Sequence, residues 1–475
     1  MNIVLVSPEV APFAKTGGLS DVSGALPIAI NNLGAGHKCS VVLPFYQMVR
    51  ESGFGPKLLR TEKIRLGSEE FNAGIFFLRH ENTDIYFIEN RKFYDRQQLY
   101  GLPSGDYPDN HLRFAFFAKA AISLINYLGN VDLIHCNDWQ SGLIPLYLRL
   151  SGNYIKTLFT IHNMAYQGLF DPQVIPLLDI PQEFFTPERL EFYGKFSFMK
   201  AGIIYSDAVS TVSKGYAREI LTPEFGCGLS GLLQTRSSSL YGIVNGVDYK
   251  EWSPQTDKYI VQNFDENTLD YKLDCKKDLL KTFGLKFDAR KPVLAVVTRL
   301  AEQKGIDIIA EVLKDILGLG AYFILLGTGN EKYNNLFSDI AKKHKNCVGV
   351  EIGFDNALAH KIEAGSDMFL MPSRYEPCGL NQMYSLKYGT IPVVRATGGL
   401  DDTIEDFNPA NNQGNGFKFA EASAAAFYAT IKRAVTLYKD KKKWLILQKN
   451  GLKCDFSWNK SAGDYLELFE RILSR

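Results

Sequence analysis

The sequence predicts an α/β protein built from two doubly wound domains. Short apolar runs rich in β-branched residues alternate with longer segments in which apolar residues recur at three- and four-residue spacing. This alternation is typical of parallel sheets crossed by helices, and it occurs twice along the chain. The length of 475 residues agrees, because an ordinary domain has about 150 residues.

The first block is expected to form one sheet with crossing helices. Its strands are predicted at Ile3–Val6, Cys39–Leu43, Ile75–Leu78, Ile85–Ile88, Leu133–Cys136, Thr157–Ile161 and Ala208–Thr211. Helices are predicted from apolar spacing at Asn110–Leu128 and Glu191–Tyr205.

The second block repeats the pattern after Asn245. Its strands are predicted at Val293–Val297, Phe323–Leu326, Val348–Ile352, Met368–Met371 and Pro392–Val394. Helical patterns separate them near Lys304–Leu317, Lys332–Lys343, Ala357–Ala364 and Gly379–Tyr388. Three further helical patterns follow at Ala424–Leu437, Lys441–Leu452 and Ala462–Ile472.

The domain boundaries are set by turn signals. The segment YGIVNGVD carries two glycines and an Asn-Gly pair between the two blocks, which indicates a hinge. We expect an N-terminal Rossmann-like domain at 1–241, a hinge at 242–252 and a C-terminal Rossmann-like domain at 253–455. A terminal helix is expected at 456–475, in a position from which it could cross back to the first domain.

Composition and charge exclude several classes of protein. The 53 Lys and Arg residues balance 52 Asp and Glu, so the net charge of +1 provides no field to hold nucleic acid or an anionic membrane. Hydrophobic residues make up 46% of the chain, but none of the uncharged runs approaches the roughly 20 residues that a membrane span needs. Seven scattered cysteines without a CxxC pair fit reduced thiols, and the N-terminal run lacks a basic leader. A cytoplasmic protein is expected.

A glycine-rich turn follows the first predicted strand. Lys15, Thr16, Gly17 and Gly18 lie directly before a helical pattern, where tandem glycines let a ligand approach the backbone and helix N–H groups face an anion. Lys15 adds a mobile positive charge. Taken alone, this pattern fits a ligand-free tight turn equally well.

The second domain carries matching features at its strand ends. Arg299 and Lys304 follow its first strand, at the sheet edge where open α/β sheets bind ligands. Gly327 begins a second glycine-rich turn. Further on, Glu376 precedes a helix start formed by Cys378, Gly379 and Leu380, so a carboxylate for sugar hydroxyls would adjoin N–H donors for a phosphate.

Seven motifs together resemble one enzyme family. They are KTGGL at 15–19, Asp138-Trp139, TIHNMAYQG at 160–168, NGVD at 245–248, RLAEQKG at 299–305, PSRYEPCGLNQMYSLKYG at 372–389 and RATGGLDDT at 395–403. In order and spacing they resemble glycosyltransferase family 5, the bacterial glycogen synthases and plant starch synthases, from residue 1 to about 460.

The resemblance implies the GT-B arrangement, in which two Rossmann-like domains face a deep cleft. It implies transfer of glucose from ADP-glucose to the non-reducing end of an α-1,4-glucan, such as glycogen or a maltooligosaccharide, with retention at the anomeric carbon. No cofactor and no metal are expected, since Arg299, Lys304, Lys15 and helix N-termini would supply the positive charge.

The resemblance also implies roles for individual residues. Arg299, Lys304 and Lys15 would bind the donor phosphates, Glu376 the glucose hydroxyls, and His162 the sugar 6-hydroxyl, with Asn163 beside it. Tyr94, Asp138 and Trp139 would face the acceptor, and Asn245 the sugar. Glu9 and Asp21 would order the glycine loop, and Phe354 would stack on adenine. For Trp139 a place in the core, and for Asn245 a role only in its turn, remain open.

Position 384 is Tyr, where many retaining GT-B enzymes have a second glutamate, so no carboxylate from this position reaches the ribose. Three alternatives remain at this point. UDP-glucose could be the donor, the chain could be a GT-B nucleotide-sugar epimerase, or it could be a non-catalytic glucan-binding protein.

Overall fold

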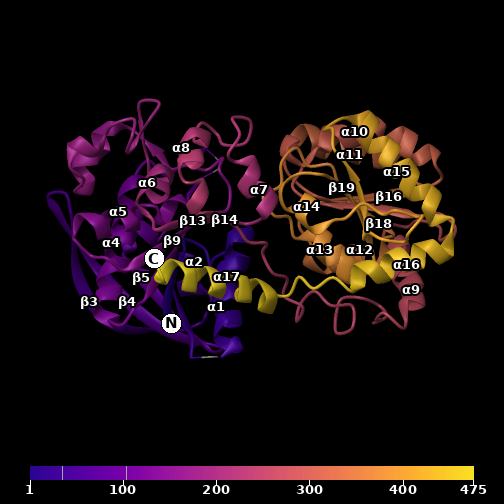
Figure 1. Ribbon diagram of the computed structural model, residues 1–475. Helices are drawn as coiled ribbons and strands as arrows, with labels where there is room; N and C mark the ends of the chain where they lie inside the picture. The colour runs from indigo at the N-terminus through magenta and orange to yellow at the C-terminus, as the bar shows by residue number, and fades with distance from the viewer. Residues whose placement is uncertain (35, 103) are drawn as a thin grey trace. The chain divides into compact units, whose positions relative to one another are not determined.

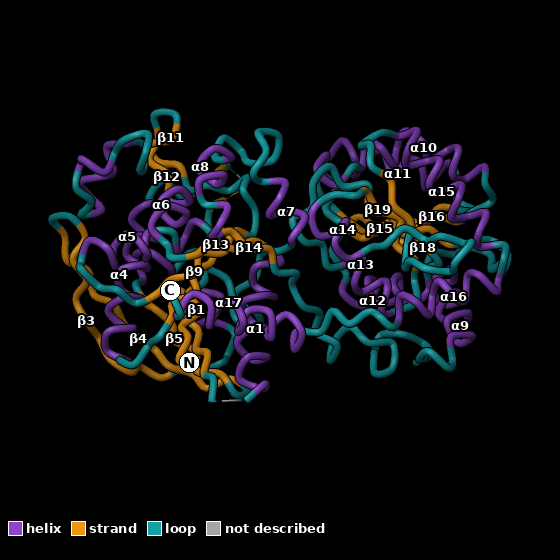
Figure 2. Tube along the Cα trace, in the orientation of Figure 1, coloured by secondary structure: helices purple, strands orange, loops and turns teal. Residues whose placement is uncertain are grey.

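The computed structural model describes residues 1–34, 36–102 and 104–475. The chain divides into two compact units, each with its own sheet and core (Figures 1 and 2). The first unit comprises 1–212, 217–246 and 458–475, and the second comprises 213–216 and 247–457. The main crossing between the units therefore falls at 246–247, within the segment YGIVNGVD.

The first unit is built on a large, mostly parallel sheet. Its strand order is β14-β13-β9-β8-β1-β2-β5-β4-β3, and the pairing is parallel from β14 to β5 and antiparallel from β5 to β3. The strands in chain order are β1 (Asn2–Val6), β2 (Lys38–Pro44), β3 (Lys57–Leu66), β4 (Glu69–His80), β5 (Thr83–Glu89), β8 (Leu133–Asn137), β9 (Lys156–Ile161), β13 (Ala208–Thr211) and β14 (Leu240–Gly242). All seven strands predicted for this block are present.

This unit also contains helices and two small separate sheets. The helices are α1 (Gly18–Leu33), α2 (Gln47–Glu51), α3 (Arg91–Tyr94), α4 (Asn110–Leu128), α5 (Leu143–Leu150), α6 (Phe198–Tyr205), α7 (Lys214–Glu219), α8 (Ser230–Thr235) and α17 (Trp458–Leu473). Of these, α7 begins in the second unit and ends in the first. The small sheets pair β6 (Gly101–Leu102) with β7 (Gly105–Asp106), and β12 (Lys195–Ser197) with β10 (Leu169–Phe170) and β11 (Glu191–Phe192).

The prediction of one helix over Glu191–Tyr205 is wrong in its first half. The structure has the hairpin β11–β12 there, and α6 begins only at Phe198. Tyr193 and Gly194 turn the hairpin with φ values of 48° and 80°, which no right-handed helix accommodates. The side chain of Ser197 then caps α6 by accepting a hydrogen bond from the Lys200 N–H.

The terminal helix α17 belongs to the first unit. It packs along α1, and Ser461 Oγ donates to the carbonyl of Val244 at 2.8 Å. Tyr465 and Phe469 place their rings 5.4 and 5.8 Å from the ring of His135 on β8. The last segment of the chain therefore helps to bury the first sheet.

The second unit has a parallel sheet in the order β17-β16-β15-β18-β19-β20. Its strands are β15 (Val293–Val297), β16 (Tyr322–Gly327), β17 (Val348–Ile352), β18 (Met368–Met371), β19 (Ile391–Arg395) and β20 (Phe417–Phe419). Its helices are α9 (Lys272–Thr282), α10 (Ile306–Gly318), α11 (Glu331–Lys343), α12 (Asn356–Gly365), α13 (Asn381–Lys387), α14 (Gly398–Thr403), α15 (Ala424–Tyr438) and α16 (Lys441–Leu452).

Both faces of this second sheet are buried, which confirms the doubly wound prediction. Along β15, Leu294 and Val296 join the core formed with α10, α11 and α15, while Val293 and Ala295 join the core formed with α9 and α12. Side chains of a strand point alternately to opposite faces, so the continuous apolar run reflects burial on both sides. Among the described residues, none of the helices is long and apolar enough to cross a membrane.

Candidate active site

The glycine loop of the first unit is held by one carboxylate. Glu9 accepts hydrogen bonds from the Thr16 N–H and hydroxyl, both at 2.6 Å, from the Gly17 N–H at 3.2 Å, and from the Tyr100 hydroxyl at 2.7 Å. Glu9 is 4% exposed, so these donors stabilise its buried charge. This arrangement agrees with the predicted ordering role of Glu9.

The same loop presents open backbone and a cation. A Cβ atom added to Gly17 or Gly18 would meet nothing within 4 Å, so a ligand could approach the backbone at the start of α1. The Lys15 ammonium pairs with the Asp21 carboxylate at 2.6 Å, and its side chain is 56% exposed. Asp21 thus holds the cation that the family resemblance assigns to the donor phosphates.

His162 and Asp138 meet at the ends of adjacent strands. Asp138 follows β8 with a φ of 55°, and its carboxylate accepts the His162 N–H at 2.8 Å. The side chain of Asn137 donates to the carbonyls of Val6 and His135, which leaves its oxygen to face His162 Nε2 at 2.9 Å. Nε2 therefore carries the proton, and Nδ1 is an acceptor.

Burial shifts the pKa values of both groups. Desolvation lowers the pKa of His162 to about 3, so its imidazole is neutral at physiological pH. Desolvation also raises the pKa of Asp138 to about 7, and the negative charge of Glu9 adds to this rise, while the His162 N–H opposes it. A neutral imidazole that accepts through Nδ1 is suited to a sugar hydroxyl.

The raised pKa of Asp138 predicts a pH-dependent effect on stability. Between about pH 4 and 7 the unfolded state ionises this carboxyl and the folded state does not, so stability falls by up to about 1.4 kcal/mol per pH unit. Asp138→Asn removes this loss. The free energy of unfolding of the variant, relative to that of the wild-type protein, should therefore increase from pH 5 to pH 7, as measured by calorimetric unfolding. Exposed Asp106→Asn is the control. A constant difference across this range would contradict the raised pKa.

Two residues assigned to the acceptor are buried among aromatic side chains. Tyr94 is fully buried and its hydroxyl donates to the Arg113 carbonyl at 2.8 Å, and its role toward an acceptor stays a prediction. Trp139 is 8% exposed, with its ring 5.0 Å from that of Phe114 and 6.0 Å from that of Phe198. These contacts fit the core alternative for Trp139, and its role toward an acceptor stays a prediction.

Asn163 and Asn245 keep polar groups near the strand ends. Asn163 accepts the Ala165 N–H at 3.0 Å, which shapes the turn after His162. Asn245 is 6% exposed, and among the described residues its side-chain oxygen has no hydrogen-bond partner. A buried oxygen without a partner is costly, so Asn245 is the better candidate for a ligand contact.

In the second unit the predicted donor residues gather around β15. Arg299 follows this strand and is exposed. Lys304 pairs with Glu376 at 2.5 Å, and the Ser373 hydroxyl donates to the same carboxylate oxygen at 3.1 Å. Glu376 is 6% exposed, and the side chain of Lys304 is 19% exposed. This structure thus brings together the cation predicted for phosphate and the carboxylate predicted for sugar.

Close backbone contacts explain several glycines of this site. A Cβ on Gly305, whose φ is 66°, would lie 2.1 Å from the Pro372 carbonyl, and one on Gly327 would lie 2.0 Å from that of Thr298. Gly379 has a φ of 74° and, together with Leu380, leads into α13. Gly305 therefore lets the loop that carries Lys304 pack against the loop that carries Glu376.

The remaining donor candidates differ in exposure. Phe354 is 87% exposed in the turn after β17, available for stacking on a planar ring. Cys378 is 5% exposed, and a Cβ on Gly399 would lie 2.1 Å from its carbonyl, which indicates a packing role. Tyr384 stacks on Trp252 with ring centroids 4.1 Å apart, so the side chain at this position serves packing.

Several residues that shape the site were not predicted. Asn137 orients His162, Tyr100 binds Glu9, and Ser373 and Asn381 support the second unit, where Asn381 Nδ2 donates to the Val297 carbonyl at 2.9 Å. Asn137 directly precedes Asp138, and its place at a strand end could have revealed it. Tyr100 carries no such signal, because only tertiary packing brings it to Glu9. Among the described residues, no three His, Cys, Asp or Glu side chains form a group that could hold a metal.

Comparison with known proteins identifies the class to which this fold and these residues belong. The starch synthase catalytic domain family matches residues 2–235, and the glycosyl transferases group 1 family matches residues 280–450. The catalytic domain of starch synthase IV from Arabidopsis thaliana, solved with ADP and acarbose, superposes with a TM-score of 0.89 at 33% identity, covering 100% of this chain and 99% of that one. Sucrose-phosphate synthase from Thermosynechococcus elongatus shares the fold, with a TM-score of 0.60 at 17% identity over 100% of this chain and 99% of that one. The fold is that of the GT-B glycosyltransferases.

Curated relatives match the whole chain. The glycogen synthase of Koribacter versatilis is 47% identical over 99% of this chain and 98% of its own length. That of Moorella thermoacetica is 44% identical over 100% of this chain and 97% of its own length. The chain belongs to the family of bacterial glycogen synthases and plant starch synthases.

Proposed function

We propose that this protein is a glycogen synthase that transfers glucose from ADP-glucose to the non-reducing end of an α-1,4-glucan, with retention at the anomeric carbon. The observation that carries the proposal is the full-length match to glycogen synthases, together with the starch synthase solved with ADP and acarbose. ADP in that relative favours an adenine nucleotide as the donor, and exposed Phe354 offers a ring for it.

The proposed chemistry depends on charge at the leaving group. When the bond between the anomeric carbon and the diphosphate oxygen breaks, negative charge grows on the diphosphate, and fixed cations there lower the barrier. Arg299 and Lys304 are the proposed cations of the second unit, and Lys15 that of the glycine loop. The oxygen of the acceptor 4-hydroxyl forms the new bond to the anomeric carbon on the face that the diphosphate leaves, and the hydroxyl proton passes to the departing diphosphate.

The neutral His162 and the carboxylate of Glu376 are proposed to hold the sugar. His162 accepts through Nδ1, because its Nε2 proton faces Asn137. Glu376 accepts from sugar hydroxyls through the oxygen that Lys304 and Ser373 do not occupy. No metal takes part in this proposal.

The direct test measures transfer from two donors. Purified protein is incubated with glycogen and either labelled ADP-glucose or labelled UDP-glucose, with and without EDTA, and label in polymer is measured. We expect incorporation from ADP-glucose that EDTA does not reduce, and release of the label by an enzyme that cleaves α-1,4 links. No incorporation from either donor would refute the proposal, and preference for UDP-glucose would refute the donor assignment.

We predict that Glu376 does not form a covalent glucosyl intermediate. Its buried carboxylate is stabilised by an ammonium at 2.5 Å and a hydroxyl at 3.1 Å, which makes it a weak nucleophile. Mass spectrometry of a quenched mixture of protein and ADP-glucose without acceptor should show unmodified peptide at this position. A stable hexose adduct on Glu376 would overturn the assignment.

A further inference from the structure

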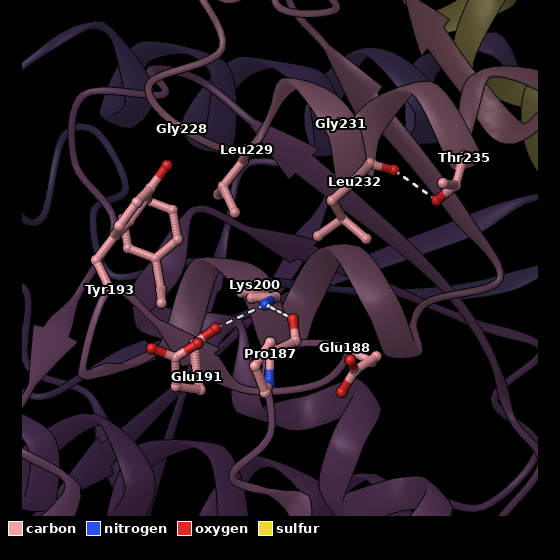
Figure 3. A pocket seen from close by; sticks show the side chains of 11 residues that line it. Pro187, Glu188, Glu191, Tyr193, Lys200, Gly228, Leu229, Gly231, Leu232 and Thr235 are labelled. Atoms are coloured by element: carbon pink, nitrogen blue, oxygen red, sulfur yellow. Dashed lines mark hydrogen bonds between the residues drawn. The ribbon is translucent and has the colours of Figure 1, made fainter.

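A cavity of the first unit lies outside the proposed donor and acceptor residues. It has a volume of about 560 Å³ and opens between the hairpin β11–β12, the start of α6 and the helix α8. Figure 3 shows Leu229 and Leu232 pointing into the space from one side, with Glu188, Glu191 and Lys200 opposite and Tyr193 at one end. The sequence motifs assign no function to this place.

Tyr193 forms an exposed and oriented aromatic surface in this cavity. Tyr193 is 82% exposed, although exposing an aromatic ring to water is less favourable than burying it against another apolar group. The Phe192 ring meets it edge to face at 4.8 Å and 87°. Both rings also lie against the backbone of Gly228, where a Cβ would come within 2.8 Å of Phe192 and 3.1 Å of Tyr193. The ring is therefore held in place while most of its surface stays open.

Lys200 fixes the polar side of the cavity. This lysine is 6% exposed, and its ammonium donates to the carbonyls of Pro187 and, at 2.7 Å, Glu191. An ammonium has three donors, so one N–H remains beyond these two bonds. The carboxylates of Glu188 and Glu191 lie beside it and supply acceptors. The cavity thus combines an aromatic face with donors and acceptors at fixed positions.

This combination matches a sugar better than other ligands. The C–H face of a hexose, positively polarised, packs on the negative face of an aromatic ring, while its hydroxyls both donate and accept. Two carboxylates disfavour a phosphate, and the charged side disfavours a purely apolar ligand. We propose that this cavity binds glucose residues of an α-1,4-glucan at a position separate from the transfer reaction. The choice of glucan rests on the proposed function.

Hydrogen bonds connect this cavity to the segment that carries His162. Gln167 Nε2 donates to the carbonyl of Cys227 at 2.8 Å, next to Gly228, and the Phe198 N–H donates to the Gly168 carbonyl at 3.0 Å. The segment TIHNMAYQG is therefore hydrogen-bonded to Cys227, directly before the lining residue Gly228, and to Phe198 of α6. A long glucan bound here would stay on the unit that holds His162, and the Michaelis constant for polymer should fall as a result.

The test uses β-cyclodextrin, a ring of α-1,4-linked glucose that has no chain end to accept glucose. Calorimetric titration should show binding to the wild-type protein, and Tyr193→Ala should weaken it by about tenfold or more. Tyr154→Ala is the matched control, since Tyr154 is a tyrosine of the same unit with 79% exposure outside the cavity. Gly231→Trp should also weaken binding and Gly231→Ala should not, because Gly231 lines the cavity and a Cβ there meets nothing within 4 Å.

Activity measurements separate this inference from the proposed function. Tyr193→Ala should raise the Michaelis constant for glycogen several-fold and leave transfer from ADP-glucose to maltotriose unchanged. A wild-type protein that elongates maltotriose but does not bind β-cyclodextrin, or a Tyr193→Ala variant that binds it as wild type does, would overturn the inference alone. Binding that depends on Tyr193 in a protein without transferase activity would support the site and refute the proposed function.

Discussion

Arg299→Ala should reduce turnover by about 10²- to 10³-fold at saturating donor, the range seen when one preorganised charge is removed from a developing anion. Arg299 is exposed at the end of β15 and does not support the core, so its loss should leave the fold intact. The effect should appear in kcat, because charge on the diphosphate grows during bond cleavage.

A matched arginine controls for the removal of charge from this unit. Arg290 is exposed and pairs with Asp288 at 3.0 Å, and Arg290→Ala should leave both turnover and the thermal midpoint unchanged. Turnover is measured as label transferred from ADP-glucose to glycogen. If Arg299→Ala kept most of its activity at saturating donor, the assignment of Arg299 to the leaving group would be wrong.

Lys15→Ala should cause a loss of the same size for the same reason. Lys63→Ala is its control, because Lys63 also pairs with a carboxylate at 2.6 Å on the surface of the first unit. Surface pairs of this kind contribute little to stability, so neither substitution should lower the thermal midpoint by more than about 1–2 °C. Equal activity of the two lysine variants would remove Lys15 from the donor site.

The sequence predicted the parallel sheets well because both faces of these strands are buried. A run such as Val293–Val297 is apolar throughout, and a strand buried on both faces is one of the few structures that require such a run. The edge strand β3 was not predicted, since most of its residues are exposed and its composition is mixed. The apolar residues of the hairpin at 191–197 also fit helical spacing, and periodicity alone does not distinguish a hairpin from a helix over so short a segment.

Local sequence shows which side chains come together where they adjoin along the chain or lie at adjacent strand ends, but it does not show surroundings that depend on packing. Glu9, Lys15 and the glycines adjoin in sequence and in space, and the loops that carry Lys304 and Glu376 meet at adjacent strand ends. Tyr94 differs, because its ring completes a buried aromatic cluster with Tyr46 and Phe116. Nothing in the local sequence distinguishes a tyrosine packed in this way from one that faces a ligand.

Glu376→Gln should separate donor affinity from turnover. The carboxylate neutralises Lys304 at 2.5 Å, so in the free protein it competes with a donor phosphate for this cation. Glutamine keeps the shape but removes the charge, so ADP should bind about twofold to tenfold more tightly. Turnover should nevertheless fall by about 10²-fold, because the proposed contact between the carboxylate and the sugar hydroxyls is weakened.

The two measurements distinguish this role from a structural one. A variant that merely disturbed the loop would lose both ADP affinity and turnover, whereas the proposed role moves them in opposite directions. Asp307→Asn is the matched control, because Asp307 pairs with Arg374 at 2.7 Å in the same unit. ADP binding is measured by calorimetric titration, and turnover by transfer to glycogen.

A double substitution completes the argument. Lys304→Ala should weaken ADP binding, and in its background Glu376→Gln should no longer tighten it, because the cation for which phosphate and carboxylate compete is gone. The two effects on ADP affinity should therefore be non-additive, as expected for side chains in direct contact. Additive effects on ADP affinity would show that Glu376 acts independently of Lys304, and the competition between carboxylate and phosphate would have to be abandoned.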